Sequence, residues 1–327
     1  MKNVNIIPYL LLLFLTIGCR KKEVPQVSYA NEMRNLVIEI SNAAKAVDPD
    51  FIIIPQNGAA LVTNSRNKDE DLALAYLAAI DGQGQEDLYY GYDRDNKATP
   101  EDVTNDLNYY LTLLEANGVE VLAIDYCKDQ EKVLDSYTKN ETNNYISFVA
   151  NERNLTNIPD YTVNVHNEND ADVTSLSEAK NFLYLINATE EFATKETFLS
   201  ALNKTNYDLV LIDRDFNDER YSSAEIEALK WKANGGRRLV IAYMSIGEAE
   251  DYRSYWKKEW GKFKTSPEWL YKENKLWRGN YKVFYWMESW KSILYGNEDA
   301  YLTSLLNVGF DGTYLDIIDA YEYYEEL

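Results

Sequence analysis

Short apolar runs, each ending in polar residues, recur along the chain and predict eight β-strands. The runs are rich in β-branched and aromatic residues and have the length of buried strands. The predicted strands are residues 51–54, 75–80, 119–124, 145–150, 182–186, 208–212, 238–246 and 312–318. Because nearly every position in these runs is apolar, we expect a parallel sheet that is buried on both faces.

Segments with helical periodicity lie between most of these runs, and several end in Gly or Asn-Gly, the usual C-cap chemistry. The predicted helices are residues 101–118, 194–205, 222–236 and 297–309. Eight alternating units predict an α/β fold, a single-domain (β/α)8 TIM barrel with its functional groups at the carboxyl ends of the strands.

The last predicted strand, 312–318, leaves too little sequence for a helix that would cover it. A helical pattern at residues 30–48 comes before the first strand, where no strand precedes it. The first and last units of an eight-fold barrel are neighbours, so we expect strand 312–318 to lie beside residues 51–54. Helix 30–48 is then expected to pack between them.

A polar stretch with little periodicity, residues 151–180, separates two half-barrels, 30–150 and 181–327. Long irregular segments are uncommon inside compact domains and often mark a functional loop or a linker. We interpret this stretch as a linker that joins the two halves.

The amino-terminal sequence "MKNVNIIPYLLLLFLTIGC" has a basic start, an apolar run and a small residue before Cys19. This pattern predicts a bacterial lipoprotein signal over residues 1–18, lipid attachment at Cys19 and a tether over 19–29. The apolar run is shorter than the ~20 residues that a membrane-spanning helix needs. We therefore expect a lipid-anchored protein of the cell envelope, outside the cytoplasm, in the periplasm or on the cell surface.

The amino-acid composition disfavours several classes of ligand and catalytic site. The chain has 33 Lys and Arg against 54 Asp and Glu, a formal charge of −21, which disfavours nucleic acid and favours neutral or cationic ligands. His166 is the only histidine and Cys127 the only cysteine after Cys19. Histidine-based triads and histidine-rich metal sites are therefore excluded, and we expect no cofactor and no metal. The glycine-rich "GQGQED" (82–87) lacks a strand-turn-helix context, so nucleotide binding is not expected.

Several motifs resemble one known family. "YDLVLIDRDF", "RLVIAYMSIGEAEDYRSYW", "GNYKVFYWMESW" and "GFDGTYLDIIDAYEYYE" are similar to sequences of the bacterial branch of the endo-α-1,4-polygalactosaminidase family, glycoside hydrolase family 114. "FIIIPQNGAALV", "AAIDGQGQEDLYYGYD" and "LLEANGVEVLAIDYC" resemble the later part of that family's barrel, yet here they come first. The resemblance thus implies a circularly permuted barrel, a fold whose adjacent ends tolerate such a change.

Glycosidic cleavage needs one acid to protonate the leaving oxygen and a second carboxylate as nucleophile or base. Asp213, Glu248 and Asp316 each follow a predicted strand, and we assign them as the catalytic candidates. Structural roles compete with this reading: Asp316 or Asp319 would cap a turn, and Asp213 would pair with Arg214 or Arg253.

Further polar and aromatic residues near strand ends are candidates for substrate binding. They are Asp215, Asp319, Tyr243, Trp286, Glu288, Asn57, Glu86, Asp125, Tyr126 and Asn187. All seven tryptophans lie between residues 231 and 290, and flat aromatic faces suit sugar rings. We expect Trp231 and Trp290 to fill seams between helices and barrel, and the tryptophans of the insertion after strand 238–246 to build the rim of the site.

One position departs from the family pattern. Relatives tend to have "YWDPEW" where this chain has "YWMESW", so Met287 replaces an aspartate and Glu288 is the nearest acid.

The leading hypothesis is a glycosidase that cleaves an α-linked, galactosamine-type polysaccharide with paired carboxylates. A non-catalytic carbohydrate-binding surface lipoprotein and a divalent-metal hydrolase remain the alternatives, and the sequence leaves the oligomeric state open.

Overall fold

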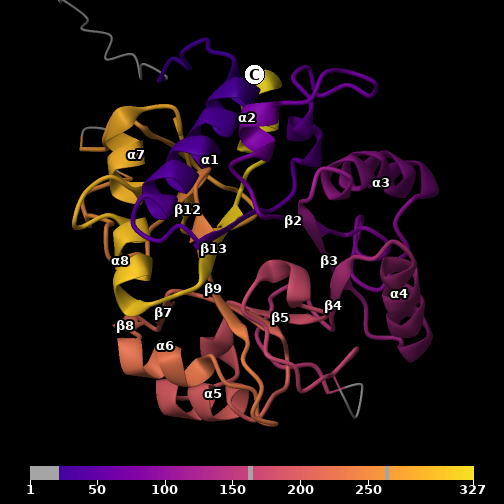
Figure 1. The fold of residues 1–327 in the computed structure, drawn as a ribbon. Helices are drawn as coiled ribbons and strands as arrows, with labels where there is room; N and C mark the ends of the chain where they lie inside the picture. The colour runs from indigo at the N-terminus through magenta and orange to yellow at the C-terminus, as the bar shows by residue number, and fades with distance from the viewer. Residues whose placement is uncertain (1–21, 161–164, 262–264) are drawn as a thin grey trace, which may run out of the picture.

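The computed structural model describes residues 22–160, 165–261 and 265–327 and has a mixed α/β architecture (Figure 1). A five-stranded parallel sheet has the order β1-β13-β9-β6-β5, and a three-stranded parallel sheet has the order β2-β3-β4. Their strands are β1 (Ile52–Pro55), β2 (Gly82–Glu86), β3 (Glu120–Tyr126), β4 (Ile146–Ala150), β5 (Phe182–Leu185), β6 (Leu209–Ile212), β9 (Leu239–Ser245) and β13 (Gly312–Asp316).

The edges of the two sheets approach each other at both ends. An isolated parallel bridge joins Gln56, just after β1, to Gly84 of β2, and another joins Ser147 of β4 to Asn181, just before β5. This arrangement is compatible with a TIM-barrel-like fold.

Helices surround these sheets (Figure 1). They are α1 (Tyr29–Lys45), α2 (Leu74–Leu77), α3 (Glu101–Glu115), α4 (Gln130–Thr142), α5 (Lys195–Leu202), α6 (Ser223–Leu229), α7 (Glu288–Leu294), α8 (Tyr301–Val308) and α9 (Ala320–Glu325). Two small antiparallel sheets lie outside the parallel strands. One has the order β10-β12-β11, and the other is the hairpin β7-β8. Their strands are β7 (Asp215–Phe216), β8 (Glu219–Arg220), β10 (Glu248–Glu250), β11 (Leu270–Glu273) and β12 (Asn280–Val283).

Seven of the eight predicted strands are confirmed to within a residue or two at their ends, but the strand predicted at 75–80 is wrong. Residues 74–77 form helix α2, and the strand is the following glycine-rich segment, β2. The reason is the packing between the sheets, where the Tyr314 ring occupies the space that side chains of β2 would otherwise fill. A Cβ atom on Gly84 would lie 1.9 Å from the hydroxyl of Tyr314 on β13. The segment therefore has no apolar pattern to detect.

The predicted pairing of the first and last strands is confirmed. β1 pairs with β13 in parallel register, with Ile52 opposite Gly312 and Pro55 opposite Leu315. Helix α1 packs against α2, which follows β1, and against α8, which precedes β13. The expectation that no helix follows strand 312–318 is wrong, because the short helix α9 follows it and packs against α1.

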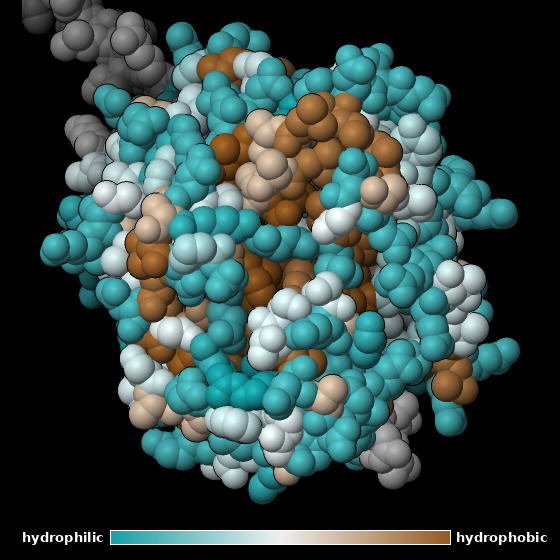
Figure 2. Space-filling view, viewed as in Figure 1, coloured by the Kyte–Doolittle hydropathy of each residue, from teal (hydrophilic) through white to brown (hydrophobic). Residues whose placement is uncertain are grey.

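The interior between the sheets is filled by aromatic rings. Tyr184 of β5 and Tyr314 of β13 are fully buried, and their ring centroids lie 5.3 Å apart, although β5 and β13 are not neighbours in the sheet. The face in Figure 2 is mostly hydrophilic, with apolar residues gathered towards its centre and upper part. The described part of the 151–180 stretch has only one short turn of helix, Leu176–Glu178.

We expect Gly84→Ala to destabilise the protein by about 1–3 kcal/mol, because the new methyl group would overlap the Tyr314 ring in a filled interior. Gly82→Ala is the matched control on the same strand, where the nearest atom is the flexible end of Leu176. Urea unfolding followed by circular dichroism measures both. An equal or larger loss of unfolding free energy for the Gly82 variant would contradict this account of β2.

Candidate active site

A cavity of about 440 Å³ opens where the carboxyl ends of the parallel strands meet. Its lining residues come from, or directly follow, seven of the eight parallel strands, and from the extension after β9. They are Gln56, Asn57, Glu86, Tyr126, Arg153, Leu155, Tyr184, Ile186, Asn187, Asp213, Tyr243, Glu250, Tyr252, Arg253, Trp277, Arg278, Asn280, Asp316, Ile317 and Asp319. This is the end of a parallel α/β fold at which active sites form.

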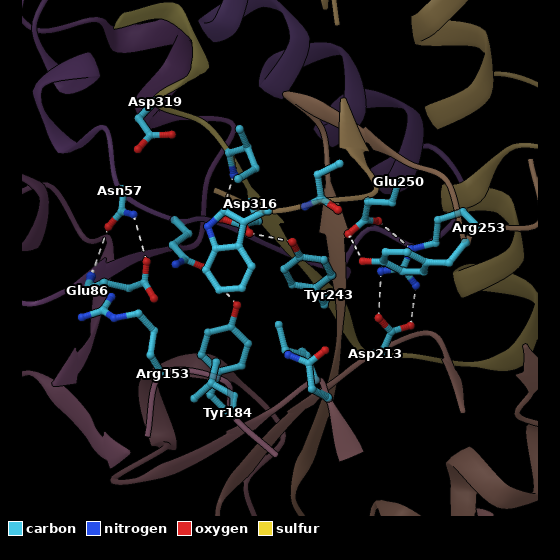
Figure 3. Close-up of a pocket in the computed structure, with 18 of the residues that line it drawn as sticks. Asn57, Glu86, Arg153, Tyr184, Asp213, Tyr243, Glu250, Arg253, Asp316 and Asp319 are labelled. Atoms are coloured by element: carbon cyan, nitrogen blue, oxygen red, sulfur yellow. Dashed lines mark hydrogen bonds and ion pairs between the residues drawn. The ribbon is translucent and has the colours of Figure 1, made fainter. Parts of the chain in front are cut away.

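Asp316 lies at the centre of the cavity (Figure 3). The hydroxyl of Tyr243 on β9 donates to its Oδ2 at 2.6 Å, and the Ile317 N–H donates to its Oδ1 at 2.7 Å. Ile317 has a φ of 60°, a left-handed conformation that a β-branched residue rarely adopts. Such strain concentrates at functional sites, where it holds a side chain in place.

The environment keeps the Asp316 carboxyl protonated up to a pH well above the one at which an aspartate usually ionises. Burial, and next the negative charge of Glu86, raise the pKa of Asp316 to about 8, although the hydrogen bonds from Tyr243 and Ile317 act in the opposite direction. A carboxyl group that is neutral at pH 7 beside a second carboxylate is the arrangement of a proton donor.

Glu86, at the end of β2, lies on one side of Asp316 and is held by its neighbours (Figure 3). The Tyr126 hydroxyl donates to its Oε1, and the Asn57 side-chain amide donates to its Oε2 at 3.2 Å. The Arg153 guanidinium lies over the Tyr126 ring, 4.1 Å from its centroid, in a cation–π contact. Residues at the ends of β1, β2 and β3, together with Arg153 of the 151–180 stretch, therefore position the Glu86 carboxylate.

The opposite wall is an ion-pair network around Arg253. Its guanidinium binds both oxygens of Asp213, at 2.6 and 2.8 Å, and its Nε donates to Glu250 Oε2 at 2.6 Å. The Tyr252 hydroxyl donates to the other oxygen of Glu250 at 2.6 Å. The two carboxylates thus share one cation, which leaves a net negative charge, and the predicted pairing of Asp213 with Arg253 is confirmed.

Among the sequence candidates, the structure brings Asp213, Asp316, Asp319, Tyr243 and Glu86 into the cavity. Three further candidates also line it. They are Asn57, Tyr126 and Asn187. The cap reading of Asp319 does not hold, because Asp319 occupies the N-cap position of α9 without a side-chain cap hydrogen bond.

Glu248, a predicted catalytic residue, lies outside the cavity lining, and Glu250 takes its place. Glu248 is 1% exposed, pairs with Lys282 at 3.1 Å and accepts from the Asn274 amide at 2.9 Å. The chain continues from β9 into β10, which pairs with β12. Glu248 there faces Lys282, whereas Glu250 faces Asn280 of the lining. The sequence alone did not reveal this antiparallel extension.

Two other acids predicted to bind substrate have structural roles instead. Asp125 is fully buried and accepts hydrogen bonds from the Tyr89 and Tyr90 N–H groups and the Ser136 hydroxyl. Asp215 lies outside the cavity, because the guanidinium of Arg214 holds it at 2.7 Å.

Trp286 and Glu288 also lie outside the cavity lining. The Trp286 ring packs against Phe284, with centroids 5.2 Å apart, and Glu288 is exposed and pairs with Lys291. Trp290 is fully buried as expected, but Trp231 is 46% exposed and lies under Arg237 rather than in a seam. 

The tryptophans of the insertion divide into two groups. Trp277 reaches the rim of the cavity and is 49% exposed. Trp256, Trp260 and Trp269 instead form a cluster of ring contacts that continues to the buried Trp290.

Sequence reasoning missed Tyr184, Glu250, Arg153 and Tyr252 as lining residues. The sequence does contain a signal for Glu250 and Tyr252, since both belong to the "SIGEAEDYR" motif. The sequence contains no signal for Arg153. It lies in the polar stretch 151–180, and only the three-dimensional structure shows that this part of the stretch passes beside the cavity.

Residues 170–327 match the family model described as glycoside-hydrolase family GH114, so the family resemblance is confirmed for this part of the chain. The matched range includes Asp213, Glu250 and Asp316, whereas Asn57 and Glu86 lie outside it.

The chain is also similar to curated proteins of other organisms. An uncharacterized protein of Methanocaldococcus jannaschii is 39% identical over 161 residues, covering 48% of this chain and 43% of that protein. Uncharacterized proteins of Thermotoga maritima and Deinococcus radiodurans are 36% and 40% identical, covering 38% and 39% of this chain and 36% and 38% of their own lengths. The chain thus spans about two fifths of the length of the curated relatives it matches.

In residues 22–160, 165–261 and 265–327, no helix is long and apolar enough to cross a membrane. In the same ranges, no group of three or more histidine, cysteine or acidic side chains is arranged to hold a metal ion. The predicted signal (1–18) and Cys19 lie outside the described residues.

Stability should depend on pH through Asp316. The ordinary pKa is 3.8 and the folded-state pKa about 8, so between these values the folded protein keeps a proton that the unfolded chain has lost. The free energy of unfolding attributable to this group therefore falls as the pH rises through that window.

Asp316→Asn cannot titrate, so its stability relative to the wild type should increase from about pH 4 to about pH 8, by up to a few kcal/mol. Urea unfolding at several pH values measures the difference. Asp213→Asn is the control and should be destabilised, because it leaves Arg253 without its bidentate partner. A pH-independent difference for Asp316→Asn would refute the raised pKa.

Met287 occupies the N-cap position of α7, makes no side-chain cap hydrogen bond and lies outside the cavity lining. Met287→Asp should restore a cap and stabilise the protein by about 1 kcal/mol, without changing binding at the cavity. Met287→Leu keeps an apolar side chain and serves as control. If thermal denaturation shows no advantage of Asp over Leu, the capping explanation for this position fails.

Proposed function

We propose that this protein is a glycoside hydrolase that cleaves an α-linked, galactosamine-type polysaccharide with Glu86 and Asp316 as its paired carboxylates. The observation that carries the proposal is the raised pKa of Asp316, about 8, caused by burial and by Glu86. Two carboxyl groups that share a site cannot both ionise easily, so the pair retains one proton at neutral pH.

The reaction follows from this charge state. The protonated member, Asp316, donates its proton to the glycosidic oxygen as the bond to the anomeric carbon breaks. The carboxylate of Glu86 then acts in one of two ways. As a base it takes a proton from a water molecule that attacks the anomeric carbon; as a nucleophile it forms a glycosyl-enzyme bond, which water, deprotonated by Asp316, then cleaves. Tyr243 donates to Asp316 and stabilises the carboxylate that forms when the proton leaves.

The remaining lining residues fit sugar binding. Tyr252 and Trp277 are about half exposed at the rim and offer aromatic faces to sugar rings. The lining contains more acids than arginines, and a cleft of one sign concentrates ligands of the opposite sign. Both features support a partly deacetylated, cationic glycan.

The same proposal includes the closed, circularly permuted (β/α)8 barrel. The bridges Gln56–Gly84 and Ser147–Asn181 support closure, because they connect both pairs of sheet edges. The family match over residues 170–327, with the similar "PQNG" segment placed ahead of it, supports the permuted order. The lipoprotein signal at residues 1–18 and the lipidated Cys19 are likewise proposed from the sequence, as is the location in the cell envelope outside the cytoplasm.

The binding-only alternative depended on Met287, which lies outside the cavity lining, so the replacement removes no carboxylate from the cavity.

Asp316→Asn and Glu86→Gln should each lower kcat by about 10³-fold or more, because each removes one partner of the acid–base pair. Oligomers of α-1,4-linked galactosamine, chitosan oligosaccharides and neutral galactan serve as substrates, and mass spectrometry of chain length follows cleavage. Glu288→Gln, on the exposed start of α7, is the control and should keep wild-type rates.

Binding of the oligomers without cleavage by the wild type would contradict the proposed function. Full activity of the Glu86 variant would leave hydrolysis possible but would reject Glu86 as a member of the pair.

A further inference from the structure

A second cavity, of about 370 Å³, lies apart from the cavity at the strand ends and shares no lining residue with it. Its walls come from β8, the segment after β10, the end of α7 and the start of α8. Neighbouring residues of the chain divide between the two cavities, since Asp213 and Arg253 line the first, whereas Arg214 and Ser254 line the second. The proposed reaction involves no residue of the second cavity.

Two guanidinium groups line this second cavity and share one counter-ion. Arg214 is 3% exposed, and its guanidinium lies over the Tyr301 ring, 3.9 Å from the centroid. Its Nε and one Nη donate to the same oxygen of Asp215, at 2.9 and 2.7 Å. The Arg220 side chain is about half exposed, and its Nε lies 3.5 Å from the other oxygen of Asp215. One carboxylate therefore serves two cations, which leaves an excess of positive charge in this cluster.

The Ser254 hydroxyl links the two arginines and has an unused proton. Its oxygen accepts from an Nη of Arg214 and from an Nη of Arg220, both at 3.1 Å. A hydroxyl group has two lone pairs and one proton, so this proton is donated away from both guanidinium groups. No acceptor for it occurs in the described part of the chain, and the other Nη of Arg214 has only a long contact, 3.5 Å from the Ser304 Oγ. Unused donors on and between two cations are the arrangement that binds an oxyanion.

The rest of the lining suits a sugar ring better than a lone anion. Ile293 and Tyr255 contribute apolar surface, and Asn297 and the exposed Asp299 contribute polar groups. Asp299 has no ion-pair partner among the residues that the structure describes. Its carboxylate repels an isolated anion but accepts hydrogen bonds from sugar hydroxyl groups. The volume lies at the lower end of the ~300–1,000 Å³ of small-molecule sites, which fits a single sugar unit.

We propose that the second cavity binds one acidic sugar unit, whose carboxylate or phosphate group contacts the two guanidinium groups and Ser254 while its hydroxyl groups donate to Asp299. A uronate and a sugar phosphate share this chemistry. The formal charge of −21 acts weakly here, because exposed charges are screened over about 8 Å at physiological ionic strength. The inference concerns binding alone and does not depend on the proposed hydrolysis.

The test measures Kd for single sugars with the full chain, by NMR titration of galacturonate, galactose 6-phosphate, neutral galactose and inorganic phosphate. Arg220→Gln removes one cation from a half-exposed position, and Ser254→Ala removes one donor without a change of charge. Arg237→Gln is the matched control. Its guanidinium also lies over an aromatic ring, that of Trp231, and pairs with one acid, Glu227, but it lines neither cavity.

We expect at least one of the two acidic sugars to bind the wild type tenfold or more tightly than galactose does. Arg220→Gln should weaken that binding by roughly tenfold or more, the usual size of a lost charge-assisted hydrogen bond, and Ser254→Ala should weaken it severalfold. Arg237→Gln should bind like the wild type. The preference between galacturonate and galactose 6-phosphate then identifies the acidic group.

Three results would overturn the inference. The first is wild-type affinity in Arg220→Gln, or an equal loss in Arg237→Gln, because the arginines of the cavity would then have no specific role. The second is galactose binding as tightly as both acidic sugars. The third is inorganic phosphate binding more tightly than either acidic sugar, or no binding of any probe, which would reject a sugar as the ligand. Each result leaves cleavage by Glu86 and Asp316 to be judged separately.

Discussion

The parallel pairing of β13 with β1 on one side and β9 on the other is the constraint on which the site depends. It brings Ile52 opposite Gly312 and Tyr243 opposite Tyr314, residues that are far apart in the sequence. Because side chains alternate along a strand, this register places Tyr314 in the interior and Asp316 two residues further on, at the cavity. The hydrogen bond from Tyr243 to Asp316 is a direct consequence of the pairing of β13 with β9.

Electrostatics then divides the acids of the cavity into two groups. On one side, Arg253 forms ion pairs with both Asp213 and Glu250. On the other side, Glu86, Asp316 and Asp319 have no such partner, and the pKa values of Asp316 and Asp319 are raised to about 8 and about 6. The division leaves the site with a protonated carboxyl group and with negative charge that no side chain of the described residues pairs with.

Much of this architecture was predictable from the sequence, since long apolar runs and glycine caps report burial and helix ends directly. The strand β2 was not predictable, because the Tyr314 ring occupies the interior space beside it and the strand contains only glycine, glutamine and one glutamate. Among the acids, Asp213 and Asp316 follow parallel strands as expected. The motif does not distinguish Glu248 from Glu250, because nothing in it shows that the chain continues into an antiparallel pair in which Lys282 lies opposite Glu248.

The central claim is that the negative charge of Glu86 helps to keep the Asp316 carboxyl protonated at neutral pH. The most direct measurement is the pKa of the Asp316 carboxyl, followed by infrared difference spectroscopy in the wild type and in Glu86→Gln, with Asp316→Asn identifying the band. The account predicts a titration near pH 8 that moves clearly lower when the negative charge of Glu86 is removed. A titration near pH 4 in the wild type, or the same elevated value in both proteins, would contradict it.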